Sequence, residues 1–155
     1  MKRTSAFPVL LIALVMLVSS ASAQRAACPA GGFSLSLPDS FSEQSFSPSE
    51  DPDLCFFWQG EGITVQAYAS YLGEVAPSSL FQVLTGNETD SGMVTVNGMQ
   101  MVYGAGADAS GSYLLYSWMD RGNNVTLYFY YPSGDASSLS RIDRIIHSIS
   151  FDAGH

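Results

Sequence analysis

Two histidines, His147 and His155, are the side chains of this 155-residue chain whose ordinary pKa suits acid–base catalysis near neutral pH. Neither belongs to a known catalytic motif, because the sequence contains no GxSxG, HExxH or CxxC pattern. Its many serines lack a neighbouring base in the sequence that would activate them. We therefore expect His147 to be a surface residue of a helix. A site assembled from distant residues stays open as the alternative, which would make the protein a small secreted hydrolase.

Acidic residues are densest between Asp39 and Asp53, where they could serve glycoside hydrolysis or bind calcium. A calcium loop needs about six to eight oxygen ligands and, in the EF-hand type, a fixed glycine and a distal glutamate, and this spacing is absent. The glycines of Gly104–Gly111 suggest a phosphate loop, but no lysine follows them and Asp108 lies among them. We expect a solvated acidic loop, a glycine-rich connector, no metal site and no cofactor.

Aromatic side chains gather on two strands that we expect to be neighbours, Tyr113–Met119 and Val125–Tyr131. Because successive side chains of a strand point to opposite faces, Tyr128 and Tyr130 share one face of the sheet. If a helix covers the other face, this one carries a row of tyrosines suited to sugar stacking or peptide docking. The alternative is that the rings belong to a core on both faces. We predict Tyr113, Tyr128 and Tyr130 as binding residues.

The helix that must cover the other face lies near the C-terminus. Pro132–Gly134 ends the preceding strand, and Asp135 or Ser137 can cap the helix. The apolar residues of the helix are spaced by three, three, one and three positions and form one stripe: Leu139, Ile142, Ile145, Ile146 and Ile149. We expect this stripe to pack on a sheet, and a short strand to follow.

Alternating or β-branched segments predict the remaining strands: Phe33–Leu37, Leu54–Trp58, Ile63–Tyr68, Met93–Val96 and Met99–Tyr103. The dipeptide Asn97–Gly98 joins the last two as a tight hairpin. We also expect a short helix that begins at Pro77 and ends at Gly86. This order predicts an α+β fold with an antiparallel β-sheet of about six to eight strands, flanked by two helices.

The first residues have the pattern of a secretory signal peptide. A basic pair precedes the apolar run Ala6–Val18, and Ala21–Ala23 is a small-residue cleavage site. We expect cleavage after Ala23, a linker over residues 24–32 and a single domain over residues 33–151. The apolar run is too short for a stable membrane span. The expected location is secreted or extracytoplasmic.

The net charge of the chain excludes two classes of partner. Cleavage removes two of the six basic residues and none of the 14 acidic ones, so the net charge falls from −8 to −10. Such a surface repels phosphate, so neither nucleic acid nor an anionic membrane is an expected partner.

The two cysteines, Cys28 and Cys55, predict a disulfide in an exported chain. Lipidation of Cys28 is the alternative.

Three segments of the chain resemble the PsbP-like superfamily. They are Phe33–Pro38, with its Phe-x-Leu-x-Leu-Pro pattern, Val96–Gly98 in a hairpin, and Ile149–Phe151 after the last helix. The resemblance implies an antiparallel sheet with flanking helices. Superfamily members of known role act as non-catalytic binding or assembly factors, so it also implies a binding or accessory protein with an extracellular or envelope partner. It assigns no functional residue, because no site motif of the family is present.

Overall fold

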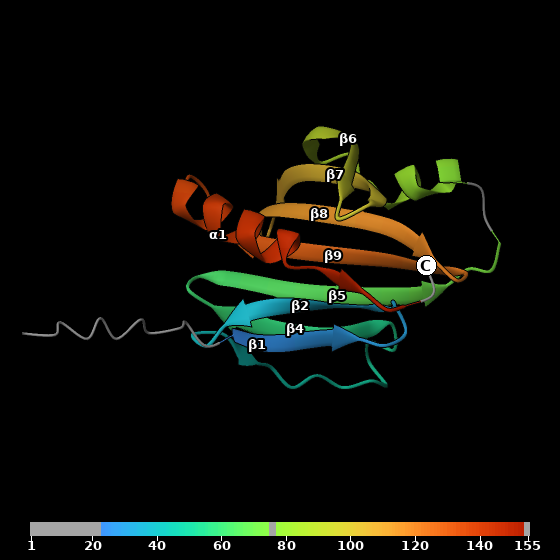
Figure 1. The fold of residues 1–155 in the computed structure, drawn as a ribbon. Coiled ribbons are helices and arrows are strands. Elements are labelled where there is room, and N and C mark those ends of the chain that lie inside the picture. The colour runs from blue at the N-terminus through green and yellow to red at the C-terminus, as the bar shows by residue number, and fades with distance from the viewer. Residues whose placement is uncertain (1–22, 75–76, 154–155) are drawn as a thin grey trace, which may run out of the picture.

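The computed structural model describes residues 23–74 and 77–153, and within them two antiparallel sheets and one α-helix form the fold (Figure 1). The small sheet has the order β1 (Ala23–Cys28), β2 (Phe33–Pro38), β10 (Ser150–Phe151). The large sheet has the order β3 (Ser42–Glu43), β4 (Leu54–Gly60), β5 (Ile63–Tyr71), β9 (Asn123–Tyr131), β8 (Gly111–Asp120), β7 (Met99–Asp108), β6 (Glu88–Val96). The helices are α1 (Ala136–His147) and a 3₁₀ helix, η1 (Pro77–Val83).

Helix α1 and the small sheet lie on the same face of the large sheet (Figure 1). Phe33 of β2 lies with its ring centroid 5.0 Å from that of Trp118 on β8, edge to face. The main core fills the space between these layers. Its fully buried members include Leu35, Leu37, Val65, Leu127, Phe129, Ile142 and Ile146. The α+β class and the antiparallel pairing are therefore confirmed.

The apolar stripe of α1 packs into this core over four of its five predicted residues. Ile142, Ile145, Ile146 and Ile149 are buried, whereas Leu139 is 41% exposed, so the prediction for Leu139 was wrong. Leu139 lies in the first turn of α1, ahead of the residues that meet β2. The N-cap is Asp135, whose carboxylate accepts a hydrogen bond from the backbone N–H of Ser137 at 3.0 Å.

Three sequence-based expectations need correction. The second flanking helix is the short 3₁₀ helix η1, so the described residues contain one α-helix and not two. Five of the eight residues of the expected connector Gly104–Gly111 belong to β7, and its last residue opens β8. The expected linker over residues 24–32 holds most of β1, which pairs along its whole length with β2. In each case pairing or packing with another element overrides a weak local pattern.

The predicted disulfide is present and joins Cys28 at the end of β1 to Cys55 on β4. It connects the small sheet to the large sheet, and Cys28 is completely buried. The bond adds a covalent link between layers that otherwise meet through apolar side chains. Across residues 23–74 and 77–153, no helix is long and apolar enough to cross a membrane.

Candidate functional site

Four tyrosines lie on the face of the large sheet opposite α1, and we call this set the tyrosine face: Tyr68, Tyr113, Tyr128 and Tyr130. The strand register places them together. Tyr130 on β9 is opposite Tyr113 on β8, and Thr126, two residues before Tyr128, is opposite Tyr68 on β5. Because side chains alternate along a strand, the residues between them, such as Leu127 and Phe129, point into the core.

The rings of the tyrosine face contact one another in a continuous row. Tyr128 and Tyr130 are stacked, with centroids 5.9 Å apart and planes 15° apart. Tyr68 meets Tyr128 edge to face at 6.0 Å, and Tyr113 lies 5.9 Å from Tyr130. These separations are typical of favourable aromatic pairs. The row is therefore a rigid unit and not a set of independent side chains.

The predicted site residues differ in exposure. Tyr128 and Tyr130 are half-buried, while Tyr113 is only 3% exposed, so a ligand on this face meets the first two rings directly. Tyr113 lies behind them as a support. Tyr68 is half-buried in the same row, and the sequence analysis missed it. The alternation of Ile63, Val65 and Ala67 with polar residues on β5 was the signal that could have placed Tyr68 on this face.

Glu88 holds Tyr113 in place at one end of the row. The Tyr113 hydroxyl donates a hydrogen bond of 2.9 Å to Oε1 of Glu88, and the backbone N–H groups of Thr85 and Gly86 donate to the same carboxylate at 3.0 and 2.8 Å. Burial opposes ionisation of Glu88, but these hydrogen bonds outweigh it and lower the pKa of Glu88 to about 2. Glu88 is therefore a charged anchor at neutral pH.

The close fit around Tyr113 explains a glycine of β7. A Cβ atom on Gly106 would lie 2.8 Å from the Tyr113 hydroxyl oxygen and 2.7 Å from the backbone oxygen of Asn87. A larger residue there would displace the ring. The neighbouring Gly104 is packed in the same way against Leu84, from the loop after η1. This loop covers the β7–β8 part of the face, and the β5–β9 part carries the half-exposed rings.

Carboxylates surround the tyrosine face. Burial raises the pKa of Tyr130 to about 12, and the negative charge of Asp108 adds to the increase. Burial also raises the pKa of Tyr68, with a contribution from Asp51. Together with Glu88, these residues place negative charge around aromatic rings, an arrangement that favours a cationic partner.

Of the two histidines considered as catalytic residues, His147 does not form a comparable cluster with other side chains in the described part of the chain. His147 is exposed on α1, where its Nδ1 atom lies 2.8 Å from the backbone oxygen of Asp143 and 3.4 Å from a carboxylate oxygen of the same residue. Both partners are one turn earlier on the same helix, as is usual for a surface histidine. His155 lies outside the described residues. Within residues 23–74 and 77–153, no three His, Cys, Asp or Glu side chains are grouped to hold a metal ion.

Comparison with known proteins bears on the fold. No family model and no curated protein matches the chain. Among solved structures, the cyanobacterial PsbP (CyanoP) from Synechocystis sp. PCC 6803 superposes with a TM-score of 0.64, at 10% sequence identity, over 86% of this chain and 95% of that one. The chain has a PsbP-like fold.

A second solved structure, from Bacteroides thetaiotaomicron VPI-5482, superposes with a TM-score of 0.55 at 11% identity. It covers 81% of this chain but 47% of that one. At these identities the likeness shows the PsbP-like fold alone. The fold does not fix the function, which depends on the side chains that this chain carries.

Proposed function

We propose that this protein is an exported, non-catalytic binding or accessory protein that recognises an extracellular or envelope protein with its tyrosine face. The contiguous row of Tyr68, Tyr128 and Tyr130 on the face opposite α1 is the observation that supports this most directly. Tyrosines offer large contact area at low entropic cost, because few torsions are lost on binding. Ring contacts that already exist in the free protein reduce that cost further.

The charge around the rings indicates the chemistry of the partner. Asp51, Glu88 and Asp108 all lie close enough to act on the tyrosine hydroxyls. A partner surface that presents arginine or lysine would gain both ion pairing at the rim and cation–π contact with the rings. We therefore propose a partner protein whose docking surface is basic.

Export is part of the same proposal. The leader-like pattern before Ala23 and the disulfide between Cys28 and Cys55 both support a location outside the cytoplasm. The PsbP-like fold adds support by analogy only, because superfamily members of known role are binding or assembly factors. The small secreted hydrolase is not favoured, since the imidazole of His147 lies against Asp143 of its own helix and not against a serine.

Site-specific photo-crosslinking tests this proposal. A benzophenone amino acid replaces Tyr130 on the tyrosine face in one sample and Leu139 on α1 in the control sample, and both proteins are irradiated in their native cells. We expect a discrete crosslinked protein from position 130 and none from position 139. Gln66→Arg places a cation beside Tyr128, its register partner, and should abolish the product by repelling a basic surface. Equal crosslinking from both positions, or none from position 130, contradicts the proposal.

A further inference from the structure

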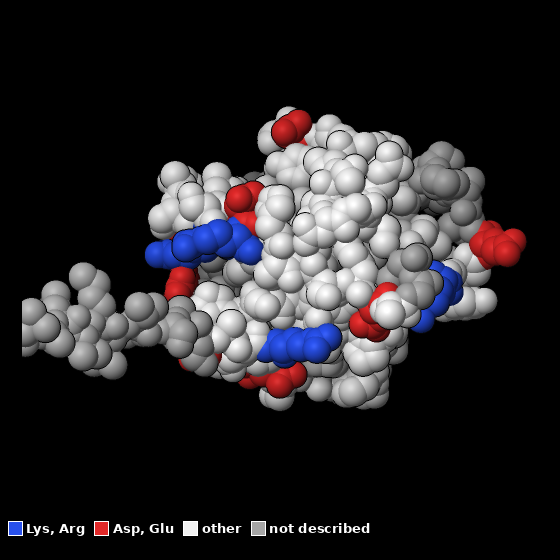
Figure 2. Space-filling view, viewed as in Figure 1, with Lys and Arg blue, Asp and Glu red and all other residues white. Residues whose placement is uncertain are grey.

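Arginines are scarce in this acidic chain, and two of them lie together. The described residues contain four arginines and no lysine. Figure 2 shows basic side chains beside α1, with acidic side chains next to them and other charged side chains elsewhere on this face. Arg141 and Arg144 of α1 are one helical turn apart. This face is opposite the tyrosine face, so the feature is independent of the proposed function.

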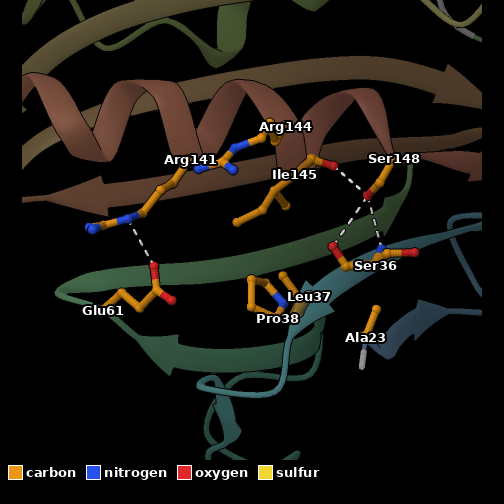
Figure 3. Close-up of a pocket in the computed structure, with 9 residues that line it drawn as sticks. All are labelled: Ala23, Ser36, Leu37, Pro38, Glu61, Arg141, Arg144, Ile145 and Ser148. Carbon is orange, nitrogen blue, oxygen red and sulfur yellow. Dashed lines mark hydrogen bonds and ion pairs between the residues drawn. The ribbon is translucent and has the colours of Figure 1, made fainter. Parts of the chain in front are cut away.

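Both arginines line a groove of about 410 Å³ between α1 and β2 (Figure 3). Its apolar lining consists of Pro38, which is exposed, and of Leu37 and Ile145, whose side chains are almost entirely buried. This volume lies in the lower part of the range of about 300–1,000 Å³ that is usual for small-molecule sites. The groove therefore suits a small ligand and not a segment of protein.

The polar side of the groove is already organised. Arg141 pairs with Glu61 through its Nε atom at 2.9 Å, and the second oxygen of Glu61 accepts a hydrogen bond from Ser40 at 2.7 Å. This pair fixes the position of the Arg141 guanidinium and uses one of its nitrogens. On the opposite side of the groove, the backbone N–H of Ser36 donates a hydrogen bond of 2.9 Å to Oγ of Ser148. These two groups therefore already have hydrogen-bond partners without a ligand.

Arg144 is the arginine of the groove that has no carboxylate partner among the described residues. Its Nε atom donates to the backbone oxygen of Ser140 at 3.4 Å, and in the described part of the chain no carboxylate lies within ion-pair distance of it. A bound anion would supply the missing partner.

We infer that the groove between α1 and β2 binds a small carboxylate with an apolar body. The planar guanidinium of Arg144 matches a carboxylate through two parallel hydrogen bonds, and Arg141, whose charge is offset by its pair with Glu61, lies one helical turn away. The apolar body lies against Pro38 and the small exposed part of Ile145. A singly charged carboxylate suits the site better than a doubly charged phosphate monoester, because the surrounding protein is strongly acidic.

Titration with hexanoate, followed by the backbone amide NMR signals of Leu37, Ile145 and Ser148, tests this inference. We expect saturable shifts at hexanoate concentrations of up to about 20 mM, since millimolar affinity corresponds to roughly 4 kcal/mol. Hexanamide has the same body without the charge and should bind at least about tenfold more weakly. Hexyl phosphate should also bind more weakly than hexanoate.

Two charge-matched variants locate the site. Arg144→Gln should weaken hexanoate binding by about tenfold or more, because it removes a charge-assisted bidentate contact. Arg121→Gln removes the same charge from an arginine that is paired with Asp120 outside the groove, and it should leave the affinity within about twofold. Absence of saturable shifts, equal binding of hexanamide, tighter binding of hexyl phosphate, or equal losses in the two variants would each overturn the inference.

Discussion

The side-chain amide of Asn97 donates a hydrogen bond of 3.0 Å to the backbone oxygen of His147, fifty residues later in the chain. The same amide donates to the backbone oxygen of Ile149 at 2.9 Å. Asn97 also has a positive φ of 47° in the β6–β7 turn. One residue thus shapes the hairpin and binds the end of α1, which explains why asparagine is suited to this position.

Substitutions at Asn97 separate these two roles. Asn97→Gly tolerates the positive φ and loses only the hydrogen bonds, so we expect a loss of about 1–2 kcal/mol in the free energy of unfolding. Asn97→Ala loses the same bonds and adds backbone strain of about 1 kcal/mol. Urea unfolding measures both variants. Equal stability of Asn97→Gly and the wild type would show that the contacts to α1 contribute nothing.

The packing of α1 predicts opposite outcomes for two aliphatic residues of the same helix. Ile145→Ala should lower the free energy of unfolding by about 2–5 kcal/mol, because Ile145 is 3% exposed and its loss leaves a cavity. Leu139→Ala should change it by less than about 0.5 kcal/mol, because Leu139 is 41% exposed. Alanine is the better helix former in both cases, so a change in helix propensity cannot explain a large loss at Ile145. Similar losses in the two variants would contradict the observed orientation of α1.

The anchor of Tyr113 predicts sensitivity to acid. The pKa of Glu88 is lowered to about 2 in the folded chain, below its ordinary value of 4.5. Its stabilisation is therefore complete above the unfolded pKa and is lost as the pH falls through about 2. Glu88→Gln should cost about 1 kcal/mol at neutral pH and should flatten the acid side of the stability profile.

Thermal unfolding at a series of pH values checks this prediction. Glu50→Gln is the control, because it removes the same charge from an exposed loop residue. Its stability profile should follow that of the wild type. If Glu88→Gln and Glu50→Gln give the same profile, the hydrogen bonds to Glu88 do not stabilise the fold.

Two half-buried tyrosines on opposite faces of the large sheet predict a crossed pattern in alkaline titration. Burial raises the pKa of both Tyr130 and Tyr116 to about 12, with a further contribution from Asp108 to the first and from Tyr103 and then Asp143 to the second. Asp108→Asn should therefore lower the pKa of Tyr130 and leave that of Tyr116 unchanged, and Asp143→Asn should do the reverse. The ring carbon that bears the hydroxyl, followed by carbon NMR, reports each pKa separately.

The same tyrosines determine how stability changes at high pH. Their folded pKa values lie above the ordinary value of 10.0, so their stabilisation is present below pH 10 and is lost as the pH rises through about 12. We expect the free energy of unfolding to fall across this interval. A flat profile between these values would contradict burial of the two hydroxyls.

The spacing of apolar residues within one segment was sufficient to predict the elements whose buried side depends on that segment alone. The spacing of Ile142, Ile145 and Ile146 identified α1 and its buried side, and the alternation around Tyr128 and Tyr130 placed both rings on one face. In each case the relevant period, near 3.6 for a helix or 2 for a strand, is contained in the segment itself. These predictions needed no knowledge of the neighbouring elements.

Features that depend on distant contacts were not predictable in this way. Gly104 and Gly106 resemble loop glycines, yet they lie within β7, where Leu84 and Tyr113 approach too closely for a side chain. The burial of Tyr113 likewise depends on Glu88, 25 residues earlier. The groove beside Arg144 forms only when α1 packs near β2, and no local pattern indicates it.

The position of β10 has a consequence for the order of folding. Ser150 pairs with Ser34 and Phe151 with Phe33, so the chain must bring together segments more than a hundred residues apart to finish β2. Closing such a loop is slow, whereas β1 can pair with β2 across a short turn as soon as both exist. Until β10 arrives, one edge of β2 is unpaired. The final closure is therefore a late event that follows the pairing of β1 with β2.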